Sequence, residues 1–245
     1  GASGVAHVFC QLYKLSHREI FLQLALAGLN HERKYFKPDW NNWQDLRKSL
    51  MLEPDCEKAM MHFKEGNKDF FLKGIDMNAW CHGAAGIGMQ RINNKGLLKD
   101  HYPHLAEEIE ACLVKTKQTE LEDRERQMQI LCHGGAGNAY LFIVAYQQTG
   151  DHKYMDTARE ILSVEVEAKN HRGNYRCGYG TAPEVEDTSL FMGNAGIGLM
   201  LLHCIQPEFK EDIMCPNINS KINIAQYLPD DNELLKALFS KYNSN

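Results

Sequence analysis

The stretch GGAGNAYLFIVAYQQT, residues 134–149, contains the pattern from which the fold of this chain is predicted. It opens with the spacing Gly-x-x-Gly and continues as an uncharged run whose apolar side chains recur at helical intervals. The positions in question are Tyr140, Leu141, Val144 and Ala145. This periodicity indicates an α-helix with a buried face. A turn at Thr149–Asp151 leads into a second, more charged pattern with Met155 and Ala158 on its apolar face, so the stretch predicts a helical hairpin.

The same pattern occurs in four copies along the chain. They begin at Gly1, Gly83, Gly134 and Gly193. The first and third copies stay in register, because Gly4 and Gly137 lie 133 positions apart and four further pairs keep that offset. The pairs are Tyr13 and Tyr146, Phe21 and Tyr154, Ala25 and Ala158, and Leu29 and Leu162. A constant offset across glycine, aromatic and apolar positions indicates a repeated pair of helices.

The fold class expected from these repeats is all-α. The first helix of each pair is rich in small residues at its start and carries little charge, whereas the second carries more, which favours an inner layer wrapped by an outer layer. Small residues let neighbouring backbones approach closely, and an α/α ring, or part of one, is the natural geometry. No sustained alternation of apolar and polar residues favours a sheet. Residues 37–79 contain no copy of the pattern and are expected to form a long connection with one or two outer helices.

Composition excludes several classes of protein. The chain has 245 residues, 24% of them charged, and a net charge of −5, and its Lys and Arg residues are scattered, so no nucleic-acid surface is expected. The best candidate for a membrane span, the uncharged stretch Thr188–Gln206, contains glycines, an asparagine and a histidine, and we interpret it as a buried helix with its approach loop, not a transmembrane segment. The start of the chain has no signal-peptide pattern, so a cytoplasmic location is expected.

Eight cysteines occur at irregular spacing, which is not typical of a disulfide framework. Six of them are interpreted as ordinary buried thiols: Cys10, Cys56, Cys112, Cys177, Cys204 and Cys215. The other two belong to Cys-His-Gly triplets that directly precede a repeat glycine, Cys81-His82-Gly83 and Cys132-His133-Gly134. Equivalent positions of two repeats face the same central space, and a helix N-terminus favours a thiolate.

Thiolates and imidazoles are zinc ligands by type. The spacing leaves three readings open. All four side chains could form a closed Cys2His2 structural site, or three could bind and leave a position open for chemistry. The two cysteines could also be buried thiols with hydrogen-bonded histidines nearby.

The residues around both triplets resemble the cyclase domain of lanthipeptide synthetases, the LanC-like family. The resemblance is carried by Trp80-Cys81-His82-Gly83-Ala84-Ala85-Gly86-Ile87-Gly88 and by Leu131-Cys132-His133-Gly134-Gly135-Ala136-Gly137-Asn138. The segment Asn42-Trp43-Gln44-Asp45-Leu46-Arg47, with Glu32-Arg33 before it, resembles the bifunctional class II (LanM-type) enzymes, which fuse a dehydratase to the cyclase. The resemblance covers residues 1–205. Residues 206–245 are expected to form a C-terminal segment, helical and packed on or ending the toroid.

This resemblance implies an α/α toroid that holds one Zn²⁺ through Cys81, Cys132 and His133. The fourth position would take water or a substrate thiolate. His82 would then be a non-ligand beside the metal, with a catalytic role as a proton shuttle or a substrate contact. The implied reaction adds a cysteine thiolate of a dehydrated precursor peptide to dehydroalanine or dehydrobutyrine, which forms a thioether ring. A dehydratase domain in the same native chain is the implied partner.

The chain departs from the family pattern at its start. A histidine that precedes the first Gly-x-x-Gly in the family, and an aspartate further upstream, would fall before Gly1. We therefore expect an incomplete, C-terminal portion of the toroid, and we interpret His7, which lies inside a predicted helix, as structural. Two alternatives remain: a LanC-like enzyme that adds glutathione to dehydrated residues, and a non-catalytic helical scaffold stabilised by zinc.

Overall fold

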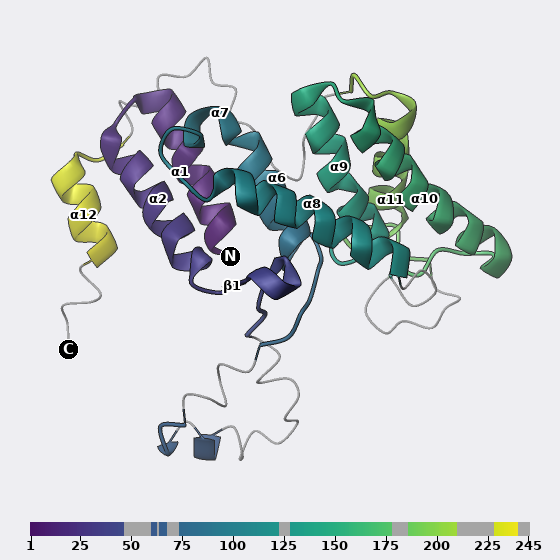
Figure 1. Cartoon of the computed structure of the whole chain (residues 1–245), viewed down its shortest axis with the longest axis horizontal. Coiled ribbons are helices and arrows are strands. Elements are labelled where there is room, and N and C mark those ends of the chain that lie inside the picture. The colour runs from purple at the N-terminus through teal and green to yellow at the C-terminus, as the bar shows by residue number, and fades with distance from the viewer. Residues whose placement is uncertain are drawn as a thin grey trace.

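Antiparallel pairs of helices make up most of the described chain (Figure 1). The computed structural model describes residues 1–46, 60–62, 64–67, 74–122, 128–177, 186–209 and 228–239. Its helices are α1 (Ala2–Ser16), α2 (Glu19–Arg33), α6 (Ala84–Asn93), α7 (Lys95–Leu98), α8 (Leu105–Glu122), α9 (Gly135–Thr149), α10 (His152–Arg172), α11 (Asn194–Ile205) and α12 (Asp231–Phe239). The predicted all-α class is confirmed.

The helices form two layers. The four that follow a Gly-x-x-Gly start, α1, α6, α9 and α11, pack on one another in that order, and α2, α8 and α10 pack against α1, α6 and α9 respectively. Helix α9 is the most enclosed, since every residue from Gly135 to Ala145 is buried. Its partner α10 buries a narrow stripe and exposes the rest to solvent. This difference is the inner and outer layering expected from the charge pattern.

The offset of 133 positions appears in the helix boundaries themselves. Helix α1 begins at Ala2 and α9 begins at Gly135, and both are 15 residues long. Their partners α2 and α10 begin at Glu19 and His152, again 133 positions apart. The predicted repeat of helical pairs is therefore confirmed for these two copies.

Close backbone contact explains the second glycine of the repeated motif. A Cβ atom at this position would lie 2.0 Å from the carbonyl oxygen six residues earlier, and this holds in three successive repeats. The pairs are Gly86 with Trp80, Gly137 with Leu131, and Gly196 with Leu190. Each loop therefore folds back over the first turn of its inner helix, and only glycine leaves room for that return.

The connection after α2 contains a small strand pair that the sequence pattern did not predict. Strands β1 (Phe36–Lys37) and β2 (Asn42–Trp43) are antiparallel and flank a 3-10 turn, Pro38–Trp40. Their pairing sets Phe36 opposite Trp43, whose rings pack at 4.8 Å between centroids. The outer helices expected between residues 37 and 79 fall largely outside the described residues.

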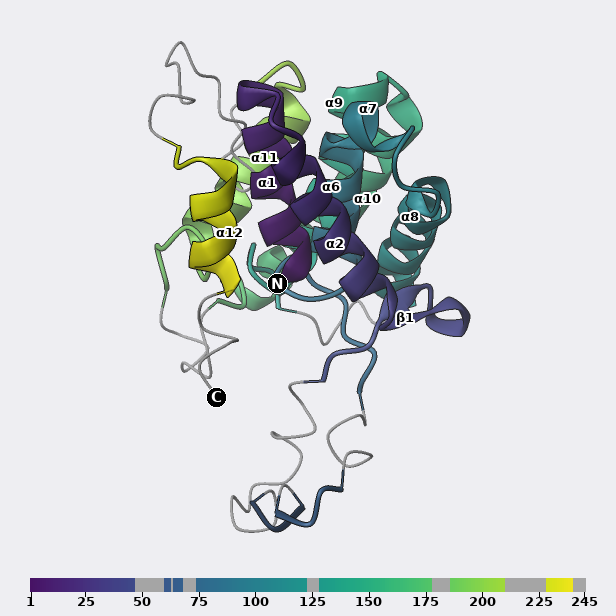
Figure 2. The same ribbon diagram turned by 90° about the vertical axis from the view of Figure 1, so that its left-hand side faces the viewer.

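The C-terminal part contributes one described helix, α12, which lies next to the α1–α2 pair in both views (Figure 2). Arg18, at the start of α2, forms an ion pair with Asp231 of α12. The division of the chain at residue 205 remains a prediction. Helix α11 occupies the end of the uncharged stretch from Thr188 to Gln206, and within the described residues no helix has the length and apolar character needed to cross a membrane.

Three of the six cysteines predicted to be buried thiols are buried. Cys10, Cys112 and Cys204 are buried and Cys177 is half-buried, while Cys56 and Cys215 lie outside the described residues. Burial raises the pKa of the Cys10 and Cys204 thiols to about 11, so these groups stay protonated at neutral pH. His7 is also buried, and its Nδ1 lies 2.9 Å from the amide nitrogen of Asn94, which fits the structural role expected for it.

Candidate metal centre

The loops that precede α6, α9 and α11 are joined by main-chain hydrogen bonds at equivalent positions. The amide of Cys81 donates to the carbonyl oxygen of Cys132 at 3.1 Å. The amide of Cys132 donates in turn to the carbonyl oxygen of Phe191 at 2.9 Å. Each of these residues lies two positions before the first glycine of its motif, so the repeat itself brings the three loops into contact. The rings of Trp80 and Phe191 pack across the same junction, with centroids 5.4 Å apart.

This ladder of loops brings three candidate ligands together. The Sγ atoms of Cys81 and Cys132 and a ring nitrogen of His133 all lie within 4.8 Å of one another. All three side chains are partly exposed, so they border open space. Both cysteines come three residues before a helix, α6 or α9, as the sequence predicts.

The donor set fits a zinc ion. Tetrahedral zinc with metal–sulfur bonds of about 2.3 Å places its ligand atoms about 3.8 Å apart, so a contraction of roughly 1 Å closes the cluster around a metal. Burial lowers the pKa of His133, which keeps its imidazole neutral at neutral pH, as a metal ligand must be. Two thiolates and one neutral imidazole would balance the charge of Zn²⁺.

His82 lies outside this cluster and points to a different partner. Its Nε2 is 3.0 Å from Oδ1 of Asp45, and its Nδ1 is 3.0 Å from the carbonyl oxygen of Cys81. Asp45 is buried, with 2% of its side chain exposed. Both ring nitrogens of His82 therefore face oxygen atoms of the protein.

A cavity of about 570 Å³ opens beside Cys81 and His82. Its walls come from the starts of α1 and α6, the end of α2 and the β2 segment. Aromatic rings contribute much of the wall, namely Tyr35, Trp43 and Trp80, together with the carboxylate of Glu32. A space of this size and lining suits a short peptide segment with apolar side chains.

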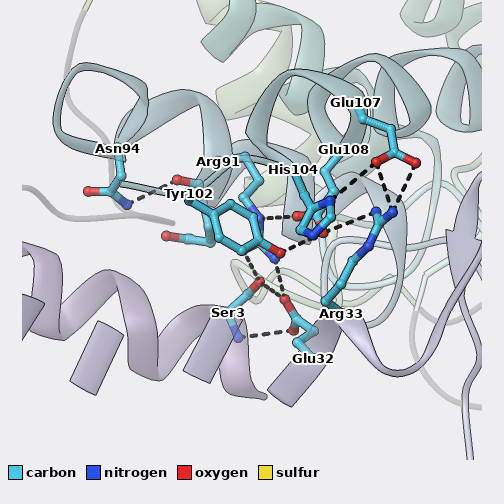
Figure 3. Close-up of polar contacts among 10 residues, drawn as sticks. Ser3, Glu32, Arg33, Arg91, Asn94, Tyr102, His104, Glu107 and Glu108 are labelled. Atoms are coloured by element: carbon cyan, nitrogen blue, oxygen red, sulfur yellow. Dashed lines mark hydrogen bonds and ion pairs between the residues drawn. The ribbon is translucent and has the colours of Figure 1, made fainter. Parts of the chain in front are cut away.

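The wall around Glu32 is supported by a buried ionic network (Figure 3). The guanidinium of Arg91, fully buried in α6, donates to Oε2 of Glu32 and to Oε2 of Glu108, each at 2.7 Å. It also donates to Oγ of Ser3 at 2.9 Å, and Glu32 accepts the amide of Ser3 at 3.1 Å. Burial opposes the charge of Arg91, but the two carboxylates outweigh it and raise its pKa. Helices α1, α2, α6 and α8 are thus tied together behind the cavity.

Two buried glutamates, Glu120 and Glu165, lie near the N-terminus of α9, which begins two residues after His133. A Cβ atom on Gly135 would lie 2.1 Å from Oε1 of Glu165 and 3.2 Å from Oε2 of Glu120. Asn138 donates its amide to Glu120 at 2.6 Å. Burial raises the pKa of both glutamates to about 7, and the charge of Glu120 adds to this effect on Glu165.

Sequence reasoning found the three clustered side chains but missed Asp45, Glu32 and Arg91. Asp45 precedes His82 by 37 positions, and no periodic pattern connects them. The sequence signal was the resemblance of Glu32-Arg33 and of the segment from Asn42 to Arg47 to the class II enzymes, which marked Glu32 and Asp45 without indicating their contacts; Arg91 had no such signal.

A comparison with known protein families agrees with the resemblance carried by the two Cys-His-Gly triplets. The chain matches the family described as lanthionine synthetase C-like protein over residues 1–215. It therefore belongs to the lanthionine synthetase C-like family, and its two helical layers are those of the α/α toroid.

A curated relative extends this finding. The chain is similar to the lacticin 481/lactococcin biosynthesis protein LcnDR2 of Lactococcus lactis subsp. lactis, with 25% identity over 229 residues. The alignment covers 89% of this chain and 21% of the relative, so the chain spans about a fifth of that protein's length.

Proposed function

We propose that this chain carries the cyclase activity of a lanthipeptide synthetase, which closes thioether rings in a dehydrated precursor peptide. The observation that carries the proposal is the cluster of Cys81, Cys132 and His133, of which Cys81 also lines the cavity of about 570 Å³. Membership of the family and the similarity to a lacticin 481 biosynthesis protein support the same reaction.

The reaction is an addition without a leaving group. The sulfur of a peptide cysteine forms a bond to the β-carbon of dehydroalanine or dehydrobutyrine, and the carbon–carbon double bond supplies the electron pair that passes to the adjacent carbonyl oxygen. A proton then adds to the α-carbon. The thiol has lost one proton and the α-carbon has gained one, so the mass of the peptide does not change.

The residues of the chain would divide this work. Cys81, Cys132 and His133 would hold zinc, which when bound supplies the positive charge that keeps a substrate thiol ionised at neutral pH. The aromatic wall of Tyr35, Trp43 and Trp80 would exclude water from the reacting segment. We assign His82 to the catalytic machinery as a side chain that touches the bound peptide, because it lines the cavity next to Cys81.

The three-ligand arrangement is favoured over a closed Cys2His2 site by the contacts of His82. Its two ring nitrogens face Asp45 and the Cys81 carbonyl, and it lies outside the described ligand cluster. X-ray absorption of the zinc-loaded protein should give two sulfur ligands, one imidazole and one light, exchangeable ligand. Two imidazoles and no exchangeable ligand would instead support a zinc-stabilised scaffold.

The activity is tested by incubating the full-length protein with a dehydrated precursor peptide and then alkylating the remaining thiols. Ring closure leaves the peptide mass unchanged but removes thiols, so fewer alkyl groups add. A parallel reaction with glutathione separates ring closure from glutathione transfer, because transfer raises the mass. Unchanged thiol numbers in both reactions would contradict the proposal.

Replacement of Cys132 by Ala should abolish zinc retention and ring closure together, because two protein ligands cannot hold the metal as three do. Cys112→Ala is the matched control. Its thiol is fully buried between α6 and α8 and lies outside the cluster, so its loss should leave the zinc content unchanged. A Cys132→Ala protein with normal zinc content would refute the ligand assignment.

The remaining parts of the proposal concern the whole protein. We propose that residues 1–205 form the toroid portion of the cyclase and that residues 206–245 form a helical segment that packs on it or ends it. We also propose that the dehydratase acting on the same peptide belongs to the same native chain, as the class II resemblance of the segment from Asn42 to Arg47 suggests. Mass spectrometry of the unprocessed native protein would test the last point.

A further inference from the structure

Asp45 is a buried carboxylate that the proposed reaction does not use directly. Its main chain is fixed on both sides, because its amide donates to the carbonyl of Ile75 at 2.9 Å and its carbonyl accepts the amide of Ile75 at 3.1 Å. Its side chain points toward the loop that contains Cys81 and His82, and its Oδ1 lies 3.0 Å from Nε2 of His82. A carboxylate withdrawn from water is costly unless it has a strong partner, and the imidazole is such a partner.

His82 connects Asp45 to Cys81, a proposed zinc ligand. Its Nδ1 lies 3.0 Å from the carbonyl oxygen of Cys81, and its main chain exchanges hydrogen bonds with Ala79 at 3.2 and 2.8 Å. The ring of His82 thus lies between a rigid carboxylate and the peptide group that follows Cys81, with one ring nitrogen facing each.

Cys81 is therefore held from two sides. Its amide is bonded to the carbonyl of Cys132 on the neighbouring loop, and its carbonyl faces the imidazole of His82. Cys132, in contrast, has its own amide bonded to the next loop, at Phe191. The Asp45–His82 contact joins the residue that follows Cys81 to the β2 side of the cavity, whereas Asn42 of β2 binds the chain four residues before Cys81, at the carbonyl of Met77.

We propose that Asp45 is a positioning residue for the metal centre, acting through His82 to fix the loop that presents the Cys81 thiolate. This inference rests on the proposed zinc site. Side chains that hydrogen-bond a metal ligand directly change metal affinity by about 10- to 100-fold when they are removed, and Asp45 acts one residue further out, so we expect the lower end of this range.

The test uses Asp45→Ala and Asp45→Asn in the full-length protein, with zinc affinity measured by competition with a chelator. Asp45→Ala should weaken zinc binding by about tenfold. Asp45→Asn keeps an oxygen acceptor but loses the charge, so it should fall between Asp45→Ala and the unmodified protein. In a His82→Ala background, Asp45→Ala should have no further effect, since its route to Cys81 is already broken.

Asp76→Asn is the matched control. Asp76 follows Ile75, the bridge partner of Asp45, and its carboxylate binds Lys115 and the side chain of Asn42 instead of the metal loop. Its replacement should leave zinc affinity unchanged. Equal loss of affinity in Asp76→Asn and Asp45→Asn would mean that Asp45 merely stabilises the fold, and this would overturn the inference.

A measurement without metal separates this inference from the proposed function. Hydrogen exchange of the metal-free protein should be at least tenfold faster in Asp45→Ala at the amides of Ala79 and His82, and unchanged at that of Cys132. If the unmodified protein binds no zinc, the proposed metal site fails while the exchange result still decides the positioning role. Unchanged exchange at His82, or full zinc affinity in Asp45→Ala, would refute that role.

Discussion

Removing the guanidinium of Arg91 is the perturbation with the largest expected effect on the fold behind the cavity. In Arg91→Met the carboxylate of Glu108, which has no exposed surface, keeps Arg33 at 3.4 Å but loses its closer cation, and Glu32, 12% exposed, loses the same guanidinium (Figure 3). Breaking a buried ion pair by deleting one partner costs about 3–5 kcal/mol, because the other charge remains buried. Tyr102 still donates to Glu108 at 2.8 Å and Arg33 remains 3.4 Å from it, so we expect a cost toward the lower end of this range.

Hydrogen exchange followed by mass spectrometry gives a local measure of this cost in the full-length protein. A loss of 3–5 kcal/mol corresponds to exchange about a hundred to a few thousand times faster in α6 and α8, since each 1.4 kcal/mol is a factor of ten. Arg91→Lys should have a smaller effect, because one ammonium retains the charge but cannot serve both carboxylates and Ser3 in the same geometry.

Glu107→Gln provides the matched control for this prediction. Glu107 pairs with Arg33 at 2.8 Å in the same region, but half of its side chain is exposed to solvent. Exposed pairs contribute little, so exchange in α8 should change by less than tenfold. The reasoning would be refuted if Arg91→Met accelerated exchange no more than Glu107→Gln does.

Two further predictions concern a buried acidic pair and a glycine in an inner helix. Burial raises the pKa of Glu120 and Glu165 to about 7, from 4.5 in the unfolded chain, so the folded state binds protons more tightly than the unfolded state. The free energy of unfolding should therefore fall as the pH rises from about 4.5 to 7, and should then level off. Glu165→Gln should flatten this profile by a few kcal/mol, at about 1.4 kcal/mol for each pKa unit removed, and parallel denaturation curves for the two proteins across that range would contradict the assignment. Gly196→Ala should destabilise α11 by about 1–3 kcal/mol, because its Cβ would lie 2.0 Å from the carbonyl of Leu190, whereas Gly198→Ala in the same helix meets no atom within 4 Å and should be neutral or slightly stabilising. Thermal unfolding of both variants checks this, and equal melting temperatures would be the contrary result.

Local patterns were sufficient to predict the helical pairs. The offset of 133 positions that relates Gly4 to Gly137 also relates the first residues of α1 and α9, because helical periodicity and a tight glycine start are both encoded within a few residues. The meeting of Cys81 and Cys132 followed from the same repeat, since equivalent positions of packed repeats lie next to each other. Their role as ligands remains a proposal.

The contacts that sequence reasoning missed join segments with no repeat relationship. Asp45 contacts His82 from a connection that lacks the Gly-x-x-Gly pattern, and Arg91 binds Glu32, which lies 59 positions earlier in the sequence. Such pairings depend on how the layers pack, and no local preference for helix or strand specifies them. The short strands β1 and β2 were missed for a related reason, because two residues are too few to show an alternation.

The hydrogen bonds that connect the three loops have a consequence for how such a centre can change. They run from amide to carbonyl and are therefore indifferent to which side chain each loop presents. One architecture can thus display a thiol in two successive turns and a benzene ring, Phe191, in the third, while the path of the backbone stays the same. Reactivity in this ring of repeats can be gained, lost or moved by exchanging single residues at a position whose geometry is already provided.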